Sequence, residues 1–181
     1  MSAGFHLEQA VRARREAGEH GPAVDDLATR AAEHLQRAGV SAFDRADMAA
    51  ASSLLQRANE LLPPKTAGRV EVLLKLGDAL AWAGERDAAR AVLAEAHSVA
   101  TELGDERLIA WATLVSGLAV VWGEASHEQL LREIDDVVHV VAQAGDHEAL
   151  AIAELGRFHA FDRARLPDPE ERLSFALEHA R

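Results

Sequence analysis

The stretch LLKLGDALAWAGERDAARAVLAEA, residues 73–96, determines the fold that the sequence predicts. Its first part repeats apolar residues at three- and four-residue steps up to Trp82, and its second part does so again from Ala89 to Ala96. This spacing places the apolar side chains on one face of each of two helices. The two parts are separated only by a short turn around Gly84. The stretch therefore predicts a helical hairpin.

The same pattern occurs in the preceding segment of the chain. When Gly39 is aligned with Gly77, three further pairs fall into register, namely Ala51 with Ala89, Leu55 with Leu93, and Ala58 with Ala96. We call the displacement from Gly39 to Gly77, which the other three pairs share, the repeat offset. A second series of glycines, Gly77, Gly117 and Gly156, continues at nearly the same interval. Self-similarity at a nearly fixed period indicates stacked units of one supersecondary structure.

These periods predict an all-α protein, a single domain over residues 1–181. We expect a leading helix over 5–17 and four repeats over 23–62, 66–103, 105–143 and 147–181. The predicted helix pairs are 23–45 with 47–62, 66–83 with 85–103, 105–122 with 126–143, and 147–164 with 168–180. Pro63-Pro64 closes the first pair because proline cannot continue a helix. At Gly104-Asp105, glycine can end one helix and aspartate can cap the next.

Composition excludes several classes of function. The net charge of −11 argues against nucleic-acid binding, which requires a basic face. No cysteine occurs, so disulfides and thiol chemistry are excluded. The N-terminus lacks the apolar core of a signal peptide, and no stretch approaches the roughly 18 apolar residues of a membrane span. We therefore expect a soluble cytoplasmic protein with no membrane partner.

Residues 73–96 resemble a tetratricopeptide repeat. Gly77, Gly84, Ala89 and Ala96 fall at the small positions where the two helices of that family cross and turn. Four positions depart from the family pattern, namely Leu73, Leu80, Leu93 and Thr101. The resemblance implies a right-handed superhelical stack of antiparallel hairpins, an α-solenoid, whose first helices line a concave surface.

Over nearly its whole length, the sequence also resembles a narrower group of helical regions. These lie downstream of the ATPase module in bacterial class III adenylate/guanylate cyclases and related ATP-binding transcriptional regulators. The fragments that carry this are His6–Ala10, Arg30–Leu35, Leu54–Ala58 and Ala176–Arg181. The resemblance implies a relay or scaffold within a longer signalling protein. No catalytic residue of those parents can be transferred, because neither lysine follows a glycine as a phosphate-binding loop requires.

Titratable clusters do not indicate chemistry. His127-Glu128 and His147-Glu148 lack the second histidine, four residues after the first, of a zinc-protease motif, and are typical of exposed first turns. Glu133, Asp135 and Asp136 form the best carboxylate group, but an amphipathic helix places such residues on its solvated face. We therefore expect no catalytic residues, no metal site and no cofactor.

The three tryptophans are the best candidates for binding. Trp82 and Trp122 lie near the ends of predicted first helices, and Trp111 lies near the start of one. On the concave surface that the resemblance implies, they could anchor a peptide. The alternative is that they pack between adjacent hairpins, since large aromatic residues dominate core packing.

Two functions therefore remain open. The first is a non-catalytic scaffold that binds protein, peptide or the adjoining domains of a larger chain. The alternative is a helical sensor that binds a small ligand in a concave pocket lined by Trp82, Trp111 and Trp122. At the C-terminus, Phe175 lies off the apolar stripe of the last predicted helix. We expect it to favour a weak homodimer through this edge, as in a chain that belongs to a longer parent.

Overall fold

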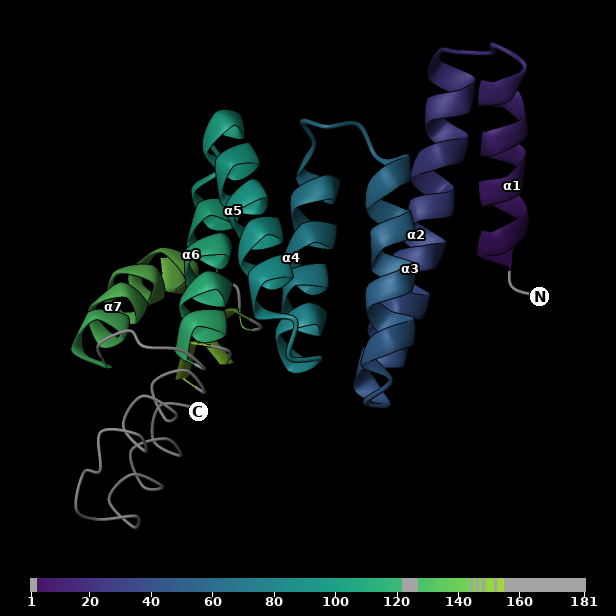
Figure 1. Ribbon diagram of the computed structural model, residues 1–181. Helices are drawn as coiled ribbons and strands as arrows, with labels where there is room; N and C mark the ends of the chain where they lie inside the picture. Colours follow the sequence, from purple (N-terminus) through teal and green to yellow (C-terminus); the bar gives the residue numbers. More distant parts are fainter. Residues whose placement is uncertain are drawn as a thin grey trace. The chain divides into compact units, whose positions relative to one another are not determined.

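The computed structural model describes residues 3–121 and 127–143, together with residues 145, 147, 149–151 and 153–154. Within these residues every regular element is an α-helix, so the predicted all-α class is confirmed there (Figure 1). The helices are α1 (Ala3–Glu16), α2 (Pro22–Asp44), α3 (Met48–Leu61), α4 (Ala67–Trp82), α5 (Arg86–Leu103), α6 (Glu106–Val121) and α7 (His127–Gln143). Most of the fourth predicted pair lies outside the described residues, as does Phe175.

These helices begin and end within two residues of the predicted bounds, because capping residues fix them locally. The Asp47 side chain accepts the backbone N–H of Ala50 at 3.1 Å at the start of α3. Asp105 accepts the N–H of Leu108 at 3.1 Å at the start of α6. Gly104 adopts the left-handed conformation, with φ 67°, so the predicted role of Gly104-Asp105 as a helix break is confirmed.

The chain divides into two compact units at the boundary between Leu103 and Gly104, which is also the boundary predicted between the second and third repeats. The single domain over 1–181 stays a prediction. In the first unit, each helix from α1 to α5 packs against the next in chain order. Their connections alternate between the two ends of the unit, so successive helices run antiparallel (Figure 1). In the second unit, α6 packs against α7.

The two hairpins of the first unit cross at equivalent glycines. A Cβ atom on Gly77 of α4 would lie 2.4 Å from Cδ2 and 2.5 Å from Cγ of Leu93 on α5. A Cβ atom on Gly39 of α2 would lie 2.8 Å from Cγ of Leu55 on α3. Glycine and leucine are equally far apart along the chain in both pairs, and the repeat offset relates one pair to the other. The crossing predicted at Gly77 is confirmed, and its closest contact is Leu93, which lies between Ala89 and Ala96.

The turns of the two hairpins also correspond. Gly84 connects α4 to α5 with φ 83°, and Ala46 connects α2 to α3 with φ 60°. Ala46 precedes Gly84 by the repeat offset, so it occupies the equivalent position. A residue with a Cβ atom adopts this conformation only at a cost in energy. The hairpin geometry therefore determines the conformation of Ala46 against its own preference.

Two apolar clusters fill the interior of the first unit. One joins Val11 of α1 to Leu35 of α2, Leu61 of α3 and Val72 of α4, together with several alanines. The other contains residues of α2, α3, α4 and α5, among them Leu55 and Leu76. Small alanine side chains between these larger ones allow the close helix spacing that the sequence predicts. None of the helices in the described ranges is long and apolar enough to cross a membrane.

Arg69 links three helices of the first unit. Its Nη1 donates to the backbone carbonyl of Asn59 at 3.1 Å, near the C-terminus of α3. Its Nη2 donates to Oε1 of Glu95 on α5 at 2.7 Å. The carbonyls at a helix C-terminus lack partners within the helix, and a guanidinium supplies donors for them. Arg69 thereby connects the first hairpin to both helices of the second.

Candidate functional site

Trp82 is the last residue of α4, one residue before the predicted end of this helix. It is 59% exposed, the most exposed large apolar side chain in the part of the chain that the structure describes. Its side chain is hydrogen-bonded to Asp78, one helical turn earlier. Since the carboxylate can only accept, the indole N–H donates. Trp82 is thus held against its own helix while most of its surface faces solvent.

The environment of Asp78 differs from that of an ordinary surface carboxylate. Burial raises the pKa of the Asp78 carboxyl above its usual value. The nearby ammonium group of Lys75 and the hydrogen bond from Trp82 act in the opposite direction on this pKa. Lys75, Asp78 and Trp82 follow one another at three- and four-residue spacing, so they lie on one side of α4. We call these three residues the Trp82 face.

Of the other two predicted tryptophans, the structure describes Trp111. Trp111 lies in α6, in the second unit, and is 7% exposed. Burial to this extent favours the packing interpretation for Trp111. Trp122 lies outside the described residues. Of the three candidates, Trp82 is the one that the described residues show to be exposed.

A groove of about 360 Å³, which no pattern in the sequence predicts, lies between α1 and α3. Its lining consists of Glu8, Val11, Arg12, Arg15, Glu16, Arg57, Glu60 and Leu61. The lining is mostly charged, with three guanidinium groups and three carboxylates. These charges balance, so the groove offers neither an anion nor a cation a net attraction.

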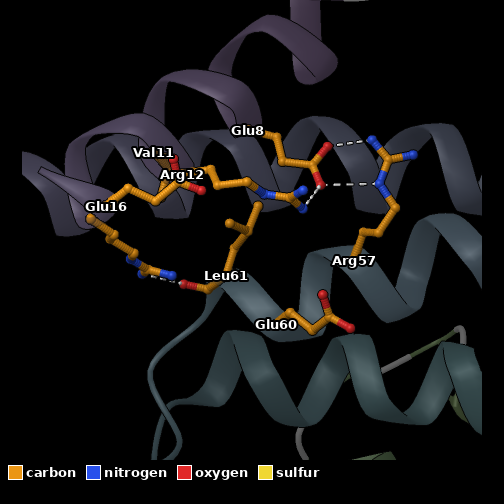
Figure 2. A pocket seen from close by; sticks show the side chains of 8 residues that line it. Glu8, Val11, Arg12, Glu16, Arg57, Glu60 and Leu61 are labelled. Carbon is orange, nitrogen blue, oxygen red and sulfur yellow. Dashed lines mark hydrogen bonds and ion pairs between the residues drawn. The ribbon is translucent and has the colours of Figure 1, made fainter.

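The centre of the groove is the carboxylate of Glu8, whose side chain is 5% exposed. Arg57 of α3 approaches it with two donors, Nε to Oε1 at 3.1 Å and Nη2 to Oε2. Nη2 of Arg12, one turn along α1, lies 3.6 Å from Oε1. Figure 2 shows the side chains of Arg12 and Arg57 converging on this carboxylate from two helices. The forked pair joins residues 49 positions apart and fastens α1 to α3.

A third arginine strengthens the same junction. Nη2 of Arg15 on α1 donates to the backbone carbonyl of Leu61 at 3.2 Å, at the end of α3. Together with Arg69 from α4, it supplies donors to the C-terminal end of α3 from both neighbouring sides. The polar contacts in the groove therefore hold α1 in place.

One signal in the sequence could have indicated Glu8. It lies three residues before Val11 and one after Leu7, and these two pack into the apolar cluster of the first unit. A carboxylate at such an inward position requires a cation from another element. The identity of that cation depends on how α1 meets α3, and no local pattern specifies it.

Protonation of Glu8 should weaken this junction. The hydrogen bond from Arg57 holds the pKa of Glu8 below its ordinary value of 4.5, although burial acts in the opposite direction. A lowered folded-state pKa contributes stability that is fully present above pH 4.5 and is lost as the pH falls through the lowered value. Wild type should therefore exceed Glu8→Gln in unfolding free energy at neutral pH, and the difference should shrink on acidification. Urea titrations across this range measure it, and a pH-independent difference would contradict the assignment.

The remaining polar candidates lie on the surface where they are described. Asp135 and Asp136 are exposed on α7, as the amphipathic pattern predicts. Two further histidines, His97 on α5 and His139 on α7, are exposed as well, and Nε2 of His139 is 2.8 Å from the Gln143 amide nitrogen. Among the described residues, no group of three or more histidine, aspartate or glutamate side chains could hold a metal ion.

No protein-family model matches the chain, and no curated protein has significant sequence similarity to it.

Proposed function

We propose that this chain is a non-catalytic helical-repeat scaffold that docks a protein or peptide segment on the Trp82 face. The observation that carries the proposal is the exposed indole of Trp82, tied by a hydrogen bond to Asp78. Tryptophan is enriched among the residues that contribute most to binding energy at protein interfaces. A ring that is already fixed loses little conformational entropy on binding, so it suits the role of anchor.

The proposed architecture is a tetratricopeptide-like, right-handed superhelical stack. Its support is the recurrence of one crossing, Gly39 with Leu55 and Gly77 with Leu93, at the repeat offset. The recurrence of the left-handed turn at Ala46 and Gly84 supports it independently. Repeats of this kind present extended surfaces to partners, because each hairpin buries only the sides that face its neighbours.

Docking is preferred over the small-ligand sensor because the tryptophans differ in exposure. A ligand pocket would enclose its aromatic lining, whereas Trp82 is 59% exposed and Trp111 is buried in the other unit.

The resemblance to the helical regions of cyclases and ATP-binding regulators supports a further part of the proposal. We propose that the scaffold works in the cytoplasm and that the docked segment belongs to an adjoining domain or a partner of a signalling protein. Self-association through the C-terminal edge at Phe175 remains part of the same proposal.

Selection from a random-peptide phage library tests the docking proposal. Peptides enriched on the wild-type protein should bind the Trp82→Ala variant roughly 30-fold more weakly, as expected for the loss of a dominant anchor. Phe5→Ala is the matched control, because Phe5 is also exposed, at 40%, but lies on α1. Its effect should be small. Peptides that bind wild type and Trp82→Ala equally, or a selection that enriches none, would refute the proposal.

A further inference from the structure

The Trp82 face combines two groups that attract a cation. The face of an indole ring carries partial negative charge, and tryptophan is the strongest aromatic partner for a cation. Asp78 adds a carboxylate one turn away on the same helix, close enough to accept the indole N–H. An ionised carboxylate has about four acceptor positions on two oxygens, so the indole uses only part of its capacity.

The hydrogen bond also fixes how the two groups lie relative to each other. It ties the N–H edge of the ring to the carboxylate, while 59% of the side chain remains accessible. A planar cation stacked on the exposed ring could therefore direct an N–H toward Asp78 at the same time. Guanidinium can stack and donate in this way, whereas a lysine ammonium is a compact, strongly hydrated charge that cannot stack.

We propose that the Trp82 face recognises an arginine side chain of the docked segment, stacked on Trp82 and paired with Asp78. This inference rests on the proposed docking function and names the chemistry of the partner. The charge of the chain agrees with it, since a net charge of −11 favours approach of a basic segment. Burial of Asp78 also favours the binding of a cation, because a carboxylate that has lost part of its hydration gains more from a nearby positive charge.

Lys75 acts as an internal competitor at this face. It lies three residues before Asp78, and its charge already acts on that carboxylate. An incoming guanidinium would have to share Asp78 with this ammonium or displace it. Removing the charge at position 75 should therefore strengthen binding, whereas removing the charge at position 78 should weaken it. A general surface effect on stability would not produce these opposite signs.

Titration of the full chain with N-acetyl-arginine amide tests the inference. The NMR signal of the Trp82 indole N–H, assigned by its loss in Trp82→Phe, should shift with millimolar affinity. N-acetyl-citrulline amide, which is neutral and nearly identical in shape, should shift it little. Asp78→Asn keeps an acceptor for the indole and should weaken arginine binding roughly two- to fivefold. Lys75→Met should strengthen it by a similar factor.

Equal shifts with arginine and citrulline, or an arginine affinity unchanged in Asp78→Asn, would overturn the inference. The phage selection separates this failure from failure of the docking proposal. Selected peptides that require Trp82 but contain no arginine would leave docking intact and refute the arginine assignment. Selected peptides whose arginine cannot be replaced by citrulline would support both.

Discussion

Gly77→Leu is expected to lower the free energy of unfolding by about 1–3 kcal/mol, because it inserts a side chain where two helices touch. Even a Cβ atom at this position would approach Cγ of Leu93 to 2.5 Å, well inside normal contact distance. Gly77 and Leu93 are both buried, so the side chain could be accommodated only by separating α4 from α5. Urea denaturation followed by far-UV circular dichroism measures the effect.

Gly68→Ala provides a matched control for the Gly77 substitution. Gly68 lies in the first turn of the same helix, and a Cβ atom there would meet no heavy atom within 4 Å. Alanine should leave stability unchanged or raise it by up to about 1 kcal/mol, since it reduces the conformational freedom of the unfolded chain. Equal stability of wild type and Gly77→Leu would mean that this glycine does not lie at a helix crossing.

Arg57→Ala should lower the free energy of unfolding by about 1.5–3 kcal/mol, the range for hydrogen bonds to charged groups. The substitution leaves the Glu8 carboxylate, 5% exposed, with Arg12 as its remaining cation at 3.6 Å. A buried carboxylate without adequate partners costs free energy that the unfolded chain does not incur. Urea denaturation measures this loss.

Amide hydrogen exchange should show where stability is lost in Arg57→Ala. The amides of α1 should exchange faster than those of α5, because the Glu8–Arg57 pair fastens α1 to α3. Arg30→Ala is the control, since Arg30 lies 4.0 Å from Asp26 in an exposed pair and should contribute less than about 1 kcal/mol. Loss of stability no greater than that of the control would contradict the role assigned to Arg57.

The helices were predictable from the sequence because their signals are local. Pro63-Pro64, Gly104-Asp105 and the glycine at position 84 end or begin helices through their own backbone preferences. The contact of Gly39 with α3 and that of Gly77 with α5 were predictable for a related reason. A repeated unit must bury the same positions each time, so the period itself reveals the crossing.

Other features depend on tertiary structure and were not predictable. Ala46 adopts a left-handed conformation because the first hairpin requires the same turn that Gly84 forms in the second. The partner of Glu8 is set by the approach of α1 to α3, which are far apart in the chain. The position of Trp82 at the end of α4 was predicted, but its exposure and its bond to Asp78 depend on which neighbours cover that side of the helix.

Residues 39–55 and 77–93 form the same helix crossing twice, and paired double-mutant cycles test this recurrence most directly. The two cycles combine Gly39→Ala with Leu55→Ala and Gly77→Ala with Leu93→Ala, and urea denaturation gives the unfolding free energies. Each Gly→Ala substitution should be destabilising alone and should lose most of its cost once the facing leucine is truncated, because the contacts at 2.8 and 2.4 Å involve that side chain. Additive costs in either cycle would show that the glycine and leucine do not meet there, and the repeat register would be wrong.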